Sequence, residues 1–135
     1  MNFPENCIRG IPDKSFLINN RMASPNLFPF QEEYARVDGW IEQSINWEDD
    51  DNVIEFTLNQ RKDDGKLRFS AGVAIIPRIE IDLLNSRPVI DGKLSYERYC
   101  LEDNPYHGNI LLQANIPKPL KRLIIAGLCL AASVK

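Results

Sequence analysis

The sequence predicts an α+β fold: one compact domain over residues 1–135, with a mixed or antiparallel sheet of about four to five short strands and about two to three helices. Three observations carry this prediction. Several segments alternate apolar and polar residues as half-buried strands do, prolines at positions 4, 12, 25 and 29 interrupt any long early helix, and an apolar run near the C-terminus predicts a buried final helix. With 135 residues, 44% of them apolar and 26% charged, the chain has the size and composition of one globular domain.

Short elements are predicted before residue 40 and a longer strand after it. Residues 7–11 form a candidate strand, and Asp13 is positioned to cap a short helix through residue 18, because its carboxylate can accept an unpaired N–H of the first turn. Residues 40–47 alternate strictly. This pattern predicts a half-buried strand with one face formed by Ile41, Gln43, Ile45 and Trp47.

Two structures fit residues 52–62. Alternation along this segment suits a strand that turns at Gly65 into a second strand, whereas preceding aspartates and a shared face for Ile54 and Leu58 suit a helix, which we favour. Residues 67–76 then predict a strand whose end is apolar on both faces and therefore central in its sheet. Residues 79–85 fit a short helix or a strand extension, and residues 95–101 alternate again as a strand.

The apolar run over residues 123–134 predicts a buried helix. At about 1.5 Å per residue it would extend roughly 18 Å, which is short of the roughly 30 Å hydrocarbon core of a bilayer, so we expect no membrane insertion. Pro117 and Pro119 favour a helix start just before it. Lys121 and Arg122 then lie near the positive end of the helix dipole, which predicts either an acidic neighbour or ligand, or two solvated side chains that tolerate the position.

Charge and cysteine content limit the compartment and the partners. The net charge is −3 and the sequence pI is near 5.2, which argues against nucleic acid as a partner. The three cysteines are odd in number and form no Cys-x-x-Cys pair, and the N-terminus lacks a secretory signal, so reduced thiols in the cytoplasm are expected. The acidic run at residues 48–51 lacks the spacing of a calcium loop, and we expect neither a metal ion nor a cofactor.

The chemistry-bearing residues concentrate in residues 100–116, which include the only histidine, His107. A histidine can act as a general base, a pH-sensitive contact or a metal ligand, and we take His107, Asp103 and Tyr106 as catalytic candidates. Arg9, Asn104 and Asn109 are candidates for ligand binding, because a guanidinium can clamp a phosphate or carboxylate and amides can orient it. The alternative is structural: a histidine ring bonded to Asp103 or to a main-chain carbonyl.

The segment also contains no established catalytic or zinc signature. Cys100 and Ser95 are the nearby nucleophiles, but neither lies in a nucleophile elbow or a protease motif. Partner-binding candidates are Trp40, Trp47 and Leu128, since exposed tryptophans anchor interfaces and an apolar helix can meet a partner. Packing in the core is the alternative for all three.

Several motifs together resemble a group of small, uncharacterised bacterial proteins with an Asn-Pro-x-His motif towards the C-terminus. They are Asp-Gly at residues 38–39, Ser-Ile-Asn-Trp-Glu-Asp at 44–49, Gly-Val-Ala-Ile-Ile-Pro-Arg at 72–78, Leu-Ser-Tyr-Glu-Arg at 94–98 and Asn-Pro-Tyr-His-Gly-Asn at 104–109. The resemblance covers the whole chain and implies a bacterial cytosolic single domain. Proteins of this kind often occur beside toxin, defence or mobile-element genes.

Two hypotheses for the function follow. The first is a non-catalytic accessory or interaction protein, linked to a bacterial toxin or defence system, with a protein partner or a homo-oligomer as its assembly. The alternative is a small enzyme or nucleotide-binding protein that uses His107 with Arg9 and Asp103. The alternative requires these three side chains to converge in one cleft, and whether the chain is an enzyme stays open.

Overall fold

The structure, a computed structural model, describes residues 3–19, 22–32 and 36–135, and its largest element is a six-stranded antiparallel sheet. The strand order is β6-β7-β4-β1-β5-β8, formed by β1 (Asn6–Gly10), β4 (Trp40–Trp47), β5 (Val73–Pro77), β6 (Leu94–Arg98), β7 (His107–Gln113) and β8 (Ser133–Val134). The α+β class is confirmed and every strand pair is antiparallel, but the sheet has more strands than predicted.

Smaller elements surround this sheet. A separate two-stranded sheet pairs β2 (Leu17–Ile18) with β3 (Met22–Ala23), close to two short 3-10 helices at Lys14–Phe16 and Pro25–Leu27. The described residues also form three α-helices: α1 (Val53–Leu58), α2 (Arg78–Asn85) and α3 (Lys118–Ala131). No helix in the described part of the chain is long and apolar enough to cross a membrane.

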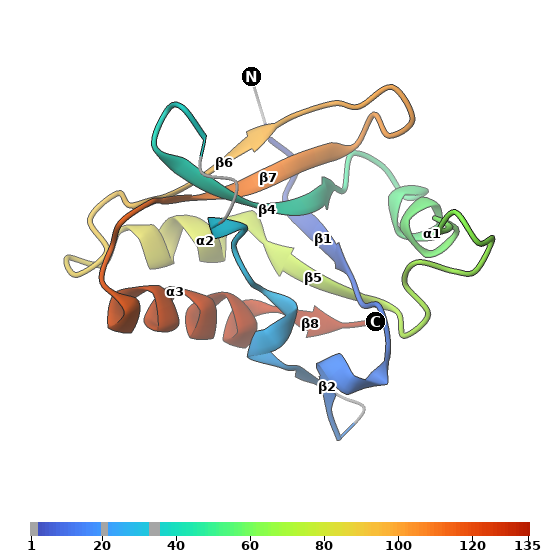
Figure 1. Cartoon of the computed structure of the whole chain (residues 1–135), viewed down its shortest axis with the longest axis horizontal. Helices are drawn as coiled ribbons and strands as arrows, with labels where there is room; N and C mark the ends of the chain where they lie inside the picture. Colours follow the sequence, from blue (N-terminus) through green and yellow to red (C-terminus); the bar gives the residue numbers. More distant parts are fainter. Residues whose placement is uncertain (1–2, 20–21, 33–35) are drawn as a thin grey trace.

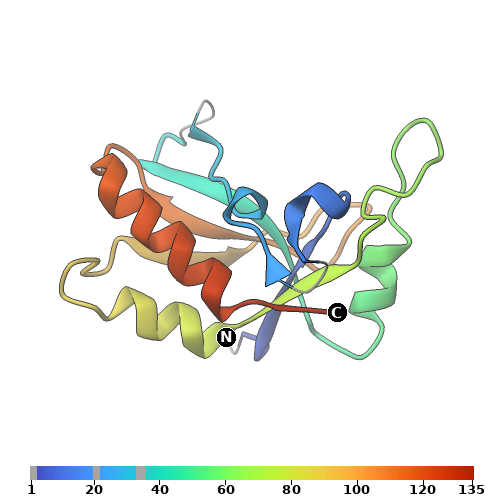
Figure 2. The same ribbon diagram turned by 90° about the horizontal axis from the view of Figure 1, so that it is seen from below.

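The helices lie on opposite faces of the large sheet. Figures 1 and 2 show α2 and α3 side by side along one face, with α1 apart from them at the other end of the molecule. Cys7 belongs to the larger core with α2 and α3, whereas its neighbour Ile8 packs with Val53 at the start of α1. Because successive strand residues point to opposite faces, this alternation assigns α1 to the second face.

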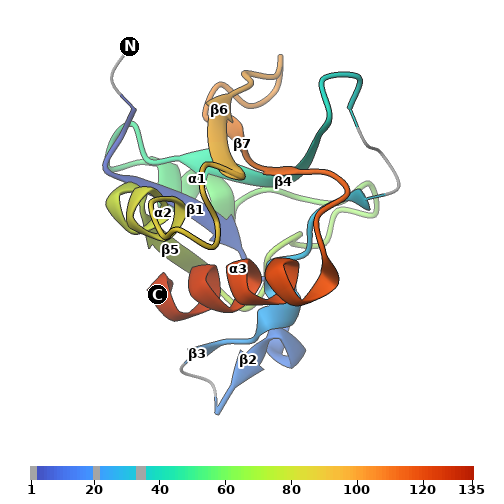
Figure 3. The same ribbon diagram turned by 90° about the vertical axis from the view of Figure 1, so that its left-hand side faces the viewer.

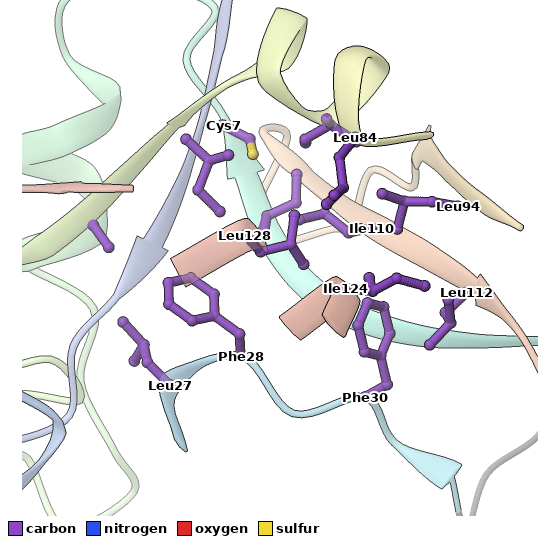
Figure 4. Close-up of a cluster of buried hydrophobic side chains, with 14 of the residues drawn as sticks. Cys7, Leu27, Phe28, Phe30, Leu84, Leu94, Ile110, Leu112, Ile124 and Leu128 are labelled. Atoms are coloured by element: carbon purple, nitrogen blue, oxygen red, sulfur yellow. The ribbon is translucent and has the colours of Figure 1, made fainter. Parts of the chain in front are cut away.

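The main core fills the space between the sheet and the pair α2 and α3 (Figure 4). Ile110 and Leu112 of β7 face Ile124 and Leu128 of α3 across it, and the segment before β4 closes the lower side with Leu27, Phe28 and Phe30. Figure 3 shows this N-terminal segment passing beneath α3. The predicted C-terminal helix is present but only partly buried: Ile124 and Leu128 are at most 1% exposed, whereas Leu130 is 79% exposed. The end of the predicted helix is wrong, because Ser133–Val134 form β8 instead.

The predicted strand over residues 40–47 matches β4 residue for residue. The four side chains expected on one face, Ile41, Gln43, Ile45 and Trp47, are all buried, as the alternation requires. β4 pairs with β7 over its whole length, from Trp40 opposite Gln113 to Asn46 opposite His107. This long ladder fixes where the end of β7 that carries His107 lies relative to β4.

Residues 52–68 contain features of both predicted alternatives. α1 forms over Val53–Leu58, which confirms the preferred helix, and a narrow turn follows with an isolated bridge between Arg61 and Leu67. Gly65 supplies the turn with a φ of 83°, a conformation that glycine adopts without strain. The strand expected over residues 67–76 is therefore shorter than predicted, because its first half belongs to this turn and β5 begins only at Val73.

One of the two basic residues near the start of α3 has an acidic neighbour. The helix begins at Lys118, after Pro117, with Pro119 in the first turn. Lys121 forms a salt bridge with Glu32, so the predicted acidic neighbour is present. That carboxylate reduces the unfavourable interaction between the lysine charge and the positive end of the helix dipole.

Candidate functional site

The ladder between the two central strands, β1 and β4, is interrupted. The strands pair at Cys7 with Trp47 and at Ile8 with Asn46, and pairing stops there. Continuing the same register would place Gly10 opposite Ser44. Instead, Arg9 inserts its side chain at this point and donates from Nη1 to the Ser44 carbonyl at 2.5 Å and from Nε to the Leu27 carbonyl at 3.0 Å.

The separation of β1 and β4 opens a pocket of about 280 Å³, which we call the split-sheet pocket. Four residues singled out from the sequence line it, namely Arg9, Asp103, Asn104 and His107. The convergence that the enzyme or nucleotide-binding alternative requires is therefore present. The volume is just below the range of about 300–1,000 Å³ typical of small-molecule sites, so the pocket suits a small ligand.

Arg9 is the most unusual group of the pocket. Its guanidinium bonds to two main-chain carbonyls, and no carboxylate of the described residues lies within salt-bridge distance of it. The residue keeps some exposed surface, yet burial lowers its pKa from 12.5 to about 10. Nη2 makes no hydrogen bond to any part of the chain that the structure describes, which leaves a donor for a ligand.

A chain of buried amides and a hydroxyl forms one wall. Asn104 donates from Nδ2 to Asn46 Oδ1 at 2.8 Å, and Asn46 donates from Nδ2 to Thr57 Oγ1 at 2.8 Å. Thr57 in turn donates to the Val53 carbonyl, and Asn104 Oδ1 accepts the main-chain N–H of Tyr106 at 3.0 Å. The side-chain amide of Asn104 is therefore used in hydrogen bonds within the protein. These bonds position the loop that leads to His107.

His107 is oriented by one of the structural bonds expected from the sequence. Its Nδ1 lies 2.8 Å from the Tyr99 carbonyl. A carbonyl only accepts, so we assign the proton to Nδ1, which leaves Nε2 as the ring nitrogen available to a ligand or a proton. Asp103 is exposed at the rim of the same pocket and does not contact the ring within hydrogen-bond distance.

Two candidates from the same sequence segment lie outside the pocket lining. Tyr106 packs edge-to-face on Phe56, with ring centroids 5.1 Å apart, and belongs to the small core beneath α1. Asn109 is 2% exposed and donates to Glu97 Oε2 at 2.7 Å. This placement does not support their expected catalytic and ligand-binding roles, because Tyr106 is occupied by packing beneath α1 and the Asn109 amide by its bond to Glu97.

The candidates for partner binding are also largely used inside the fold. Trp47 is fully buried and donates from Nε1 to the Glu97 carbonyl at 3.0 Å, and Leu128 is 1% exposed. Both side chains therefore pack in the core, as the alternative interpretation states, and offer almost no surface to a partner. Trp40, at the start of β4, keeps part of its surface exposed.

Several pocket residues were not identified from the sequence: Ser44, Asn46, Thr57, Gln60, Arg68 and Phe69. Arg68 and Phe69 follow the turn at Gly65, and the main chain holds them in place, since Arg68 N–H donates to the Gln60 carbonyl at 2.9 Å. Adjacent basic and aromatic residues after a glycine turn were a weak signal for them. No local pattern marks the separation of two strands that are thirty residues apart, so the others could not be assigned to a site.

Metal ligation has no support in the residues that the structure describes, where no group of three or more His, Cys, Asp or Glu side chains could hold an ion. Within the acidic run, Asp49 instead forms an ion pair with Arg98, and Asp50 accepts the N–H of Asn52 at 2.8 Å. Comparisons of the chain with protein-family models, with curated proteins and with solved structures gave no match.

Proposed function

We propose that this chain is a ligand-binding protein whose split-sheet pocket takes a small molecule with a phosphate or carboxylate group. The observation that carries the proposal is the Arg9 guanidinium, which is held by two carbonyls, lacks a carboxylate partner among the described residues and retains a free Nη2. A partly buried cation with no counter-ion among the described residues is costly, and an anionic ligand would supply that counter-ion.

The other polar groups of the pocket favour the same ligand charge. Arg68 is exposed and lines the pocket together with Arg9. Gln60 Oε1 accepts a hydrogen bond from Asn46, so the Gln60 side-chain nitrogen Nε2 is left to donate to a ligand. Asp103 is the single carboxylate of the lining. Two arginines therefore outweigh one aspartate in a protein whose net charge is −3, so the pocket is locally positive.

His107 adds a second property to this site. With Nδ1 directed to the Tyr99 carbonyl, Nε2 can accept a hydrogen bond from a ligand hydroxyl or donate one when the ring is protonated. Binding of an anion requires only the arginines. Proton transfer by His107 would be a further step on the same ligand, and substitution of this residue separates the two.

The test is a titration of ¹⁵N-labelled protein with inorganic phosphate and, separately, with succinate, followed by amide chemical shifts. Shifts should concentrate on β1, β4 and the residues around Phe69. Arg9→Met should weaken binding more than tenfold, because a charge-assisted hydrogen bond in a buried site contributes about 1.5–3 kcal/mol. Arg68→Gln should weaken it about two- to fivefold, since an exposed charge contributes less.

The matched control is Arg87→Gln, which removes the same charge at an exposed position outside the pocket. It should leave both affinities unchanged at constant ionic strength. Circular dichroism and thermal melts must show that the variants are folded. Equal losses in Arg68→Gln and Arg87→Gln would mean that only the overall charge matters, and the proposal would then fail.

A second candidate function, a non-catalytic interaction protein with a protein partner or a second copy of this chain, is favoured by exposed apolar side chains on α2. Ile79 is 59% exposed and Leu83 is 55% exposed, and their spacing of four residues sets them on one side of the helix. Leu130 at the end of α3 is 79% exposed. Sedimentation velocity over a range of protein concentrations tests self-association, and Leu83→Glu should abolish any concentration dependence.

A further inference from the structure

Phe69 lines the split-sheet pocket directly against the main chain of β1. A methyl group built on Gly10 would be 2.2 Å from Cγ of the phenyl ring and 2.4 Å from both Cδ atoms. Equal short distances to both Cδ atoms put that point above the face of the ring. Phe69 therefore lies face-on over Gly10, a position that any other residue at Gly10 would obstruct.

The ring is held there by its neighbours. Arg68 N–H donates to the Gln60 carbonyl at 2.9 Å, and Ser70 donates to the Pro12 carbonyl from its N–H at 3.3 Å and from its hydroxyl at 2.8 Å. Anchors on both sides of Phe69 fix its main chain. The surface that remains for a ligand is the face turned away from Gly10 together with the ring edge.

Phe69 also marks where two hollows meet. Arg9, Ser44, Arg68 and Phe69 line both the split-sheet pocket and an adjacent hollow that extends to Lys62 and Asp63. An anionic group bound between Arg9 and Arg68 is thus next to a half-buried phenyl ring. Ile45 and Leu101 add apolar surface to the lining of the split-sheet pocket.

We infer that the ligand carries a planar aromatic ring joined to its acidic group, as in an aryl phosphate or a nucleoside monophosphate, and that Phe69 is the stacking residue that selects it. This inference rests on the proposed function, because the arginines must hold the acidic group first. Aromatic rings prefer offset or edge-to-face contact with one another, and a saturated ring of similar size does not reproduce that interaction. Stacking of a base on an aromatic side chain is typically sufficient for a severalfold to a hundredfold gain in affinity.

The experiment compares phenyl phosphate, cyclohexyl phosphate and inorganic phosphate on the whole protein by calorimetry and amide chemical shifts. Phenyl phosphate should bind at least fivefold more tightly than cyclohexyl phosphate, and ring-current shifts should centre on Phe69. Adenosine monophosphate against ribose 5-phosphate then separates a nucleobase from a simple arene: a gain with the base assigns a nucleotide, and its absence assigns a smaller aryl ligand.

Phe69→Leu is the deciding variant, because leucine keeps an apolar side chain over Gly10 without an aromatic face. It should remove the preference for phenyl over cyclohexyl phosphate while affinity for inorganic phosphate stays within twofold. A preference that survives in Phe69→Leu, or no preference in the unmodified chain, overturns this inference and leaves anion binding intact. If inorganic phosphate, succinate and all the organic phosphates fail to bind, the proposed function itself is wrong.

Discussion

Replacement of Asn104 by alanine tests whether the buried amide chain holds the loop that leads to His107. Asn104 is 4% exposed and makes two side-chain hydrogen bonds, to Asn46 Oδ1 at 2.8 Å and from the Tyr106 N–H at 3.0 Å. Each bond contributes about 1 kcal/mol net, and Asn46 Oδ1 is left buried without its partner at a further cost of about 1–3 kcal/mol. We expect Asn104→Ala to lower the free energy of unfolding by about 3–5 kcal/mol.

The assay is equilibrium unfolding in urea, with thermal melts in parallel. For a domain of this length a loss of 1 kcal/mol lowers Tm by roughly 3–5 °C, so Tm should fall by about 10–20 °C. Asn52→Ala is the matched control. Asn52 is exposed before α1 and makes no side-chain capping bond, so its loss should change the free energy by less than about 0.5 kcal/mol.

Asn104→Asp sharpens the test because it preserves the size of the side chain. A carboxylate cannot donate to Asn46 Oδ1. If Asn46 reversed its amide to donate to the carboxylate, Thr57 would have to turn its hydroxyl to the Asn46 oxygen and give up its bond to the Val53 carbonyl. We expect Asn104→Asp to be at least as destabilised as Asn104→Ala at neutral pH, with partial recovery in acid, where a protonated carboxyl group can donate. If Asn104→Ala stays within about 0.5 kcal/mol of the unmodified chain, the amide chain does not stabilise this region and the reasoning is wrong.

Three further predictions concern the cysteines and Gly10. Burial raises the pKa of the Cys7 thiol from 9.0 to about 12, so the protonated thiol contributes its full stability below pH 9, and this contribution is lost as the pH rises towards 12. The free energy of unfolding should fall by about 1.4 kcal/mol by pH 10 for this reason. Cys7→Ala should show a correspondingly smaller decrease in unfolding experiments at alkaline pH. An aromatic disulfide reagent should modify the exposed Cys100 rapidly in the folded protein and Cys7 only after unfolding, which a time course in urea checks. Gly10→Ala should destabilise the protein by about 1–3 kcal/mol because it displaces the Phe69 ring, and the double variant with Phe69→Ala should recover part of that loss, whereas simple additivity would contradict the contact.

The elements that local pattern determines were predictable. The strand at residues 40–47 was identified with its faces, because one buried face forces alternation, and the start of α3 was marked by its prolines. The helix and the following turn in residues 52–68 were harder to predict, since the same apolar and polar alternation fits a helix in part and a strand in part. The apolar positions of a short amphipathic helix and of a strand coincide over so few residues.

Elements that depend on distant partners were not predictable. β8 has two residues and exists because Val134 pairs with Ala74 of β5, a contact that no local preference specifies. β2 and β3 are equally short. Strands of this length are formed by the pairing itself, which explains why the predicted sheet had too few of them.

The candidate site was predicted in part for a related reason. Arg9, Asp103, Asn104 and His107 were identified by their chemistry, and they do line one pocket. The wall that contains Phe69 was not identified, because it depends on where β1 and β4 separate. The sequence states the type of each side chain directly, whereas the residues that lie next to it across the sheet depend on the order and pairing of the strands.

Arg9 contributes both to the stability of the fold and to the chemistry of the pocket, and the two contributions can be compared. A pKa lowered from 12.5 to about 10 means that burial disfavours the charged guanidinium by roughly 3 kcal/mol. Its two hydrogen bonds to carbonyls contribute about 1.5–3 kcal/mol each, so the net contribution of Arg9 to folding is between about 0 and 3 kcal/mol. A continued ladder at Gly10 and Ser44 would satisfy the strands without any buried charge. Neither bond of Arg9 uses Nη2, and an anion at this nitrogen would supply an interaction that the described part of the chain leaves unused.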